Sequence, residues 1–332
     1  MIQRFYHYLL KNQFIFALVL VALGFLIFQL KGIIVSIFIS YILMAALIPA
    51  VKFLQRHRFP KILAVAIPYF SIFILIFALI VPLFQMFIPQ VQSFITGLPV
   101  YLNKSASLFG VEIDPKQIQN YISGEFSNFG RNALAVTGVV FGGLFSTFTV
   151  LFVSFYFLMY HDAFKRWVAK LFHETTQDHV VEVLQEIDDK LGSWLRGQLV
   201  LCFAIGFATW VALTLLGMEY ALPLAVIAGI LEILPTLGPT LSAVPAVIVA
   251  LTISPALALS VVIAFIIIQQ FENSFLVPKV MQRAVGLNPV IVIISIMIGG
   301  NLMGVMGALL AIPFVSLLFV LFRGYTSTEK AS

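Results

Sequence analysis

The chain alternates between long apolar runs and short polar segments. A helix of about 20 mostly apolar residues crosses the hydrocarbon core of a bilayer, and several runs reach that length. Because the runs are continuous and do not alternate apolar with polar residues, they predict membrane helices and argue against barrel strands. The runs of full span length are 14–30, 32–50, 62–87, 136–160, 197–217 and 256–277.

Two further apolar segments, 221–253 and 288–322, are interrupted. Pro and Gly break the first at 235–239, and Gly299-Gly300-Asn301 breaks the second. Each half of the first segment has about 13 residues, which is too short to cross about 30 Å. We expect either two re-entrant hairpins that enter from opposite sides or two tilted single passes. The predicted fold class is an all-α integral membrane protein with about eight hydrophobic segments, broken or re-entrant in the C-terminal half.

Composition and charge agree with this interpretation. The chain of 332 residues is 61% hydrophobic and 10% charged, with mean hydropathy +1.07, whereas a globular domain is about 25% charged. The net charge of +5 comes from basic residues beside the ends of apolar runs, which indicates topology and not nucleic-acid binding. The positive-inside rule places both termini, 52–61 and 161–196 in the cytoplasm and 89–132 outside it.

These patterns divide the chain into five regions. The expected regions are transmembrane helices 1–3 at 1–88, an extracytoplasmic segment at 89–135, transmembrane helix 4 at 136–160, a cytoplasmic amphipathic helix region at 161–196 and a C-terminal transport core at 197–323. Within the core, Pro223 and Pro245 frame one break, and Pro289 and Pro313 frame the other at a similar separation. Opposite orientation of the two units would make an inverted repeat, as in many secondary transporters. The alternative is that Pro is simply common in membrane helices.

The segment 174–196 has the period of an amphipathic helix. It could lie on the membrane, pack against another subunit or form a solvated connection between helices. Its apolar positions are Val180, Leu184, Ile187, Leu191 and Trp194, and the charged positions that we assign to the opposite face are Glu182, Glu186, Asp188 and Asp189.

Glu232 and Glu272 are ionisable residues that stand beside the helix breaks of the core. A carboxylate at membrane depth costs about a few kcal/mol unless it is paired, hydrated or protonated, so such residues mark transport sites. Gln269, Glu272 and Asn273 share one helical face and could bind a hydroxylated solute, a cation or a proton. The alternative places Glu272 at the headgroups and makes Glu232 a helix-end residue that stabilises the turn. Glu219 is expected in a loop at the outer surface.

The candidate residues form two groups. The substrate- or ion-binding candidates are Glu232, Gln269, Glu272, Asn273 and Asn301, and the hinge candidates at helix breaks are Pro235, Gly238, Pro239, Gly299, Gly300 and Pro313. No phosphate-binding loop, His-Glu-x-x-His pair or Gly-x-Ser-x-Gly elbow is present, so we expect no enzyme activity, no cofactor and no metal site. The single cysteine, Cys202, cannot form an intramolecular disulfide.

The core also carries specific sequence motifs. They are Trp194-Leu-Arg-Gly-Gln198, Glu232-Ile-Leu-Pro-Thr-Leu-Gly-Pro239, Gln270-Phe-Glu-Asn-Ser-Phe-Leu-Val-Pro-Lys279, and Gly286-Leu-Asn-Pro289 through Gly299-Gly-Asn-Leu-Met-Gly304 to Ala311-Ile-Pro313. With them the chain resembles the autoinducer-2 exporter family of bacterial membrane proteins over nearly its whole length. The resemblance implies a multi-pass, homo-oligomeric transporter of the inner membrane, a pentamer, whose mobile C-terminal part works against an N-terminal scaffold.

Three hypotheses on function remain open. The resemblance implies either export of a small polar solute, such as the quorum-sensing signal autoinducer-2, or sodium(lithium)/proton antiport, because family members are assigned to each. Export would place Gln269, Glu272 and Asn273 at the site, and antiport would use Glu232 and Glu272 as titrating groups. The third hypothesis is a membrane scaffold whose helix at 174–196 recruits partners. The expected partners are the lipid bilayer, a small polar solute or a monovalent cation or proton, and further copies of this chain, with no nucleic acid.

Overall fold

The computed structural model describes residues 30–75, 133–218, 220–234, 237–281 and 288–329, with scattered positions in 18–29 and position 78. Every regular element in these ranges is helical, which agrees with the predicted all-α class. Most of the first expected span, the segment 89–132, Glu219 and Pro235 lie outside the described residues.

The helices are of very unequal length. They are α3 (Lys31–Arg56), an unlabelled helix at Lys61–Leu75, α6 (Ala133–Met159), α7 (His161–Ala169), α8 (Gln177–Leu215), α9 (Ala221–Leu231), α10 (Leu237–Ile253), α11 (Pro255–Phe271), α12 (Val277–Met281) and α13 (Pro289–Glu329). Among the described residues, 4 helices are long and apolar enough to cross a membrane, and a fifth arises if α6 and α7, bent by 70°, count as one. The expectation of about eight segments is therefore not confirmed by these spans.

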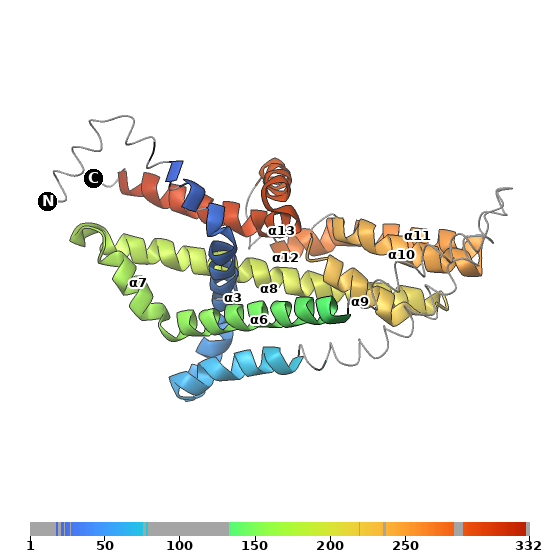
Figure 1. The fold of residues 1–332 in the computed structure, drawn as a ribbon, viewed down its shortest axis with the longest axis horizontal. Helices are drawn as coiled ribbons and strands as arrows, with labels where there is room; N and C mark the ends of the chain where they lie inside the picture. The colour runs from blue at the N-terminus through green and yellow to red at the C-terminus, as the bar shows by residue number, and fades with distance from the viewer. Residues whose placement is uncertain are drawn as a thin grey trace.

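The long helix α8 is the central element. In Figure 1 it runs along the length of the molecule, with α3 crossing it and with α9, α10 and α11 gathered at the end away from α7. The helix passes without interruption through 196–197, where the amphipathic region was expected to give way to a span. Ile187, Leu191 and Trp194 are buried in a cluster with side chains of α3 and α13. The segment 174–196 therefore packs against other helices of its own chain.

The crossing of α3 and α8 depends on special residues in both helices. Pro49 lies inside α3 and has no N–H, so the Ala45 carbonyl loses its helical partner. Arg196 of α8 donates from Nη1 to the carbonyl oxygens of Ala45 at 3.4 Å and Ala46 at 3.2 Å. Gly192 permits this close approach, because a Cβ there would overlap the Ala45 carbonyl. The two helices are thus joined through their backbones.

The segment 221–253 folds as a helical hairpin. Ala221 and Leu224, at the start of α9, are buried in one cluster with Ala246 and Ala250, near the end of α10. This contact requires α10 to run back along α9. Gly238 is needed at the turn, because a Cβ there would overlap the carbonyl of the last residue of α9. Of the two expected alternatives for this segment, the described residues show the hairpin.

The break in α13 lies at a different place from the one expected. Sequence analysis placed it at Gly299-Gly300-Asn301, but these residues are helical and the backbone leaves helical geometry at Gly304, with φ 62° and ψ −144°. Only glycine adopts this conformation readily. Gly299 and Gly307 instead meet where the two arms of α13 fold together, because a Cβ on either would overlap the carbonyl of the other. The expectation was wrong because these glycines serve close helix packing, as small residues do in lipid.

The remaining hinge candidates lie in regular structure where they are described. Pro239 occupies the first turn of α10, where the helix requires no N–H donor. Pro313 is buried inside α13, and the helix continues through it. The turn between α9 and α10 and the bend at Gly304 are therefore the places where these two apolar segments are interrupted.

Candidate functional site

Glu232 lies at the point where α9 ends. It follows the last residue of the helix, Leu231, and precedes the turn to α10. The end of a helix leaves main-chain carbonyls without helical donors, and the Gln198 side chain supplies one of them. Its Nε2 donates to the Glu232 carbonyl oxygen at 2.7 Å. Glu232 is only 1% exposed, so this helix end is fixed deep inside the packed helices.

Glu272 lies at an irregularity in a second helix. The α-helical geometry of α11 ends at Phe271, and the backbone widens into a π-helical turn over Glu272–Leu276 before α12 begins. Turns of this kind are rare and occur frequently at functional sites, because they rotate side chains away from the regular helical register. Glu272 is 4% exposed. Its carboxyl group is therefore buried among the helices.

The structure brings the two glutamates together. Their side chains form a hydrogen bond with each other. A hydrogen bond between two carboxyl groups requires a proton on one of them. The second oxygen of each group, Oε2, is buried and has no hydrogen-bond partner among the described residues.

Two side chains of α8 complete the polar cluster. Gln198 is 1% exposed, and its Oε1 is also buried without a partner in the described part of the chain. The Cys202 thiol, one helical turn further on, lies beside the Gln198 amide. Sequence analysis did not place either residue at the site. The signal that was available is the motif that ends in Gln198, an amide that directly precedes an apolar run.

The other predicted binding residues are not buried with this pair. The Asn273 and Asn301 side chains are exposed and Gln269 is partly exposed. Asn273 follows Glu272 in the π-helical turn, and its side chain is exposed whereas that of Glu272 is buried. Asn301 lies on the first arm of α13. Of the predicted residues, the structure buries Glu232 and Glu272 together, and Gln198 and Cys202 of α8 lie beside them. A binding role for Gln269, Asn273 and Asn301 stays a prediction.

A second buried acid, Asp188, occupies the half of α8 that was predicted to be amphipathic. It accepts hydrogen bonds from the Tyr41 hydroxyl at 2.6 Å and pairs with His161 Nε2 at 2.8 Å and Lys165 Nζ at 2.5 Å. Asp188 is 3% exposed, so its assignment to the charged outer face was wrong. The physical reason is its register, since it lies four residues after Leu184 and therefore on the apolar face. Polar donors on α3 and α7 satisfy it there.

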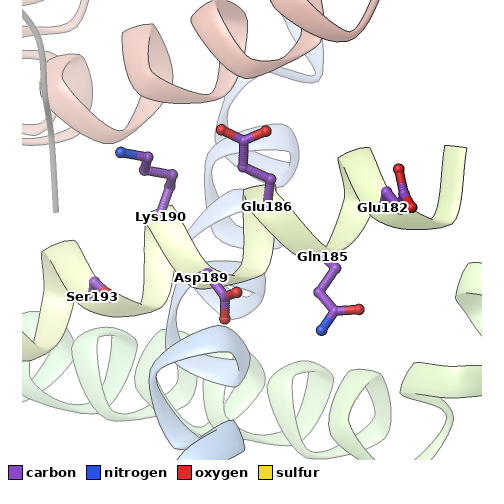
Figure 2. A pocket seen from close by; sticks show the side chains of 6 residues that line it. All are labelled: Glu182, Gln185, Glu186, Asp189, Lys190 and Ser193. Carbon is purple, nitrogen blue, oxygen red and sulfur yellow. The ribbon is translucent and has the colours of Figure 1, made fainter. Parts of the chain in front are cut away.

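The exposed face of the same half-helix borders an open groove. Figure 2 shows Glu186 and Lys190 on one side of α8 and Gln185 and Asp189 on the other. The Oε1 atom of Glu186 lies 3.9 Å from the Nη1 atom of Arg323, on α13. The cavity has a volume of about 350 Å³. Its lining residues are Glu182, Gln185, Glu186, Asp189, Lys190 and Ser193.

Comparison with known proteins gives the chain a family. The model described as "AI-2E family transporter" matches residues 15–327. Over 173 residues the chain is 33% identical to "Putative transport protein YrrI" of Bacillus subtilis (strain 168), covering 52% of this chain and 49% of YrrI. It is 32% identical over 186 residues to "Putative transport protein YueF" of the same strain, covering 56% of this chain and 50% of YueF.

A third relative is matched over a longer region. The chain is 26% identical over 312 residues to "Putative transport protein MT0215" of Mycobacterium tuberculosis (strain CDC 1551 / Oshkosh), covering 90% of this chain and 84% of MT0215. The chain spans about half the length of YrrI and YueF. The family model covers both helix breaks and the buried carboxyl pair, and it confirms the resemblance carried by the sequence motifs. The chain therefore belongs to the AI-2E transporter family.

Proposed function

We propose that the chain is a proton-coupled secondary transporter in which the Glu232–Glu272 pair exchanges a proton for a monovalent cation, Na⁺ or Li⁺. The observation that carries this proposal is the buried hydrogen bond between the two carboxyl groups, each with a second oxygen that lacks a partner among the described residues. Oxygen atoms are the ligands that hard cations prefer. A buried acceptor without a partner also costs free energy, and a proton or a cation that binds there removes this cost.

Charge balance argues for a monovalent occupant. The proton shared by the carboxyl groups leaves one negative charge, and burying a net charge in apolar surroundings is unfavourable. A second proton neutralises the pair, and so does one monovalent cation. Both loaded states are therefore neutral, whereas a divalent cation would leave a positive charge. The two occupants compete for the same oxygens, which is the requirement for one-for-one exchange.

The backbone around the pair supports alternating access. Glu232 stands at the turn between α9 and α10, and Glu272 stands in the π-helical turn after α11. Discontinuous helices near the middle of the membrane form the binding sites of many secondary transporters. A small change of angle at either break would turn the pair from one side of the membrane to the other. We also propose an inner-membrane location with both termini cytoplasmic, and a homo-oligomer, a pentamer, as the family resemblance implies.

A second candidate is export of a small polar solute such as autoinducer-2. The description of the matching family names an AI-2E transporter, and the unpartnered oxygens of Gln198, Glu232 and Glu272 could accept hydrogen bonds from solute hydroxyl groups. In that case the pair would carry the proton that drives export. This alternative predicts solute flux without a requirement for Na⁺ or Li⁺.

Reconstituted protein tests the two candidates. Proteoliposomes with an acidic lumen and an entrapped pH-sensitive dye are given NaCl, LiCl or choline chloride outside. We expect Na⁺ and Li⁺, but not choline, to alkalinise the lumen, and we expect Glu232→Gln and Glu272→Gln to reduce the rate to that of protein-free liposomes. Glu182→Gln makes the same chemical change at a side chain that is 79% exposed, and should behave as wild type.

The outcomes separate the hypotheses. Cation-dependent proton flux that survives in both glutamine variants would refute the pair as the exchange site. Accumulation of autoinducer-2 in inverted vesicles, unchanged by a sodium gradient, would support solute export instead. The absence of any flux of either kind would leave the membrane scaffold.

A further inference from the structure

We propose that Gln198 is the third ligand of the Glu232–Glu272 site, and that its side-chain oxygen makes the site prefer a monovalent cation to a second proton. This inference rests on the proposed function, because it concerns the occupant of the same site. It assigns a role to a residue of α8, which belongs neither to the α9–α10 turn nor to the π-helical turn after α11.

The orientation of the Gln198 amide is fixed by its partner. Its Nε2 lies 2.7 Å from the Glu232 carbonyl oxygen, and a carbonyl can only accept a hydrogen bond. The amide nitrogen must therefore face the Glu232 carbonyl oxygen. The Cys202 sulfur also interacts with this amide group. The Oε1 atom is left without a donor among the described residues, although the side chain is 1% exposed. Buried amide oxygens are nearly always satisfied in native structures, so this oxygen is available to a ligand.

Three buried oxygens lack a partner among the described residues, and their side chains are linked, because Gln198 bonds to the Glu232 main chain and Glu232 bonds to Glu272. The three oxygens are the Oε1 of Gln198 and the Oε2 atoms of Glu232 and Glu272, and each of these side chains is at most 4% exposed. They come from three different elements, namely α8, the end of α9 and the π-helical turn. An occupant that contacts these three oxygens would hold the end of α9 and the π-helical turn against α8. Its departure would release them.

The chemistry of an amide explains the preference for a cation. The amide oxygen is a neutral ligand, so it adds coordination without changing the single negative charge of the proton-sharing pair. A cation gains a ligand from it, whereas a second proton forms its covalent bond to a carboxylate oxygen and gains at most a hydrogen bond. Removal of the amide oxygen should therefore weaken cation binding more than proton binding. The loss of one supporting group at a cation site costs about tenfold to a hundredfold in affinity.

Direct binding of ²²Na⁺ to the purified full chain tests this role without a need for transport. A scintillation proximity assay gives the dissociation constant at several pH values, and thermal unfolding in detergent shows whether each variant is folded. We expect Gln198→Met, which keeps the size of the side chain, to raise the Na⁺ dissociation constant by about tenfold to a hundredfold. Competition by protons should persist in this variant. Gln185→Met is the matched control, since Gln185 is an exposed glutamine of the same helix.

A second variant separates the ligand from the hydrogen bond to the α9 end. Gln198→Glu keeps a side-chain oxygen but loses the amide nitrogen, so we expect it to bind Na⁺ at least as tightly as wild type. A purely structural role predicts the opposite, with both variants impaired alike. The Gln198→Glu comparison also decides the question if Gln198→Met does not fold.

The failure of this inference differs from the failure of the proposed function. Unchanged Na⁺ affinity in Gln198→Met, or no Na⁺ binding by wild type, would overturn the role of Gln198. The proposed exchange is judged separately, by the proton flux of wild type and of Glu272→Gln in liposomes.

Discussion

The two clusters of buried acids in this chain are built in opposite ways. Asp188 accepts from Tyr41, His161 and Lys165, which lie on two other helices, so its charge is paired. Glu232 and Glu272 have each other as partners, and both retain an oxygen without a donor among the described residues. A fully satisfied buried charge holds helices together, whereas an incompletely satisfied one marks a site that awaits an occupant.

The backbone is regular around Asp188 and irregular around the two glutamates. Asp188 and the Gly192–Arg196 contact with α3 lie in regular helices, where the backbones touch and the Arg196 side chain bonds to α3. Glu232 and Glu272 lie at a turn and at a π-helical irregularity. The first cluster has the features of a rigid joint between the N-terminal helices and α8. The second has those of a part that moves.

The largest expected effect concerns the joint. Replacement of Asp188 by Ala leaves Lys165 with a charge that is mostly buried and without its acceptor, which should lower the free energy of unfolding by about 3–5 kcal/mol. Chemical denaturation of the purified protein in detergent measures this change. Asp189→Asn alters the neighbouring exposed acid and should cost less than about 0.5 kcal/mol. A loss below about 1 kcal/mol in Asp188→Ala would show that the Asp188 cluster does not act as a rigid joint.

A somewhat smaller effect is expected where α3 and α8 touch. Gly192→Ala places a Cβ against the Ala45 carbonyl and close to Arg196 Nη1, at 2.9 Å, so the helices must separate. We expect the free energy of unfolding to fall by about 1–3 kcal/mol, measured by chemical denaturation in detergent. Gly143→Ala provides the control, because a Cβ at Gly143 has no atom within 4 Å and Ala favours a helix. Equal stability of the two variants would show that the contact is loose.

Substitutions in the carboxyl pair should abolish proton flux with little effect on stability, unlike substitutions at the Asp188 joint. In Glu232→Gln and Glu272→Gln an amide of nearly the same size takes the place of the protonated member of the pair, and one carboxyl group remains. We expect the free energy of unfolding to change by less than about 1 kcal/mol, in either direction, while cation-dependent proton flux is lost. Thermal unfolding and flux are measured on the same preparation. A large loss of stability in either variant would place the pair with Asp188 as a structural element.

The sequence drew attention to each of the two glutamates, though not to their pairing, because the relevant signal is local. An ionisable residue in an apolar run, directly beside a Pro/Gly break, is costly enough to require a function, and this holds for Glu232. Glu272 was found by the same reasoning together with its polar neighbours. The helices followed from continuous apolar runs, and the resemblance to the family was carried by motifs around the breaks. None of these inferences needed knowledge of which helices pack together.

What the sequence left undecided depends on contacts between distant helices. Asp188 could be recognised as buried only from its register with Leu184, because its donors lie on α3 and α7. Gln198 acts through a main-chain carbonyl of α9, for which a sequence carries no side-chain pattern. Gly304 looks like its neighbouring glycines, and only the positive φ separates the turn from the packing positions.

The smallest effect is expected at the polar neighbours of the pair. Gln269→Ala and Asn273→Ala remove side chains that are partly or fully exposed and that the structure does not bury with Glu232. Because surface substitutions usually change stability by less than about 0.5 kcal/mol, we expect little change in unfolding. Proton flux should also stay at the wild-type rate in the liposome assay. If instead either variant lost flux as completely as Glu272→Gln, the transported species would have to contact this outer face, which would favour a larger hydroxylated solute over a bare cation.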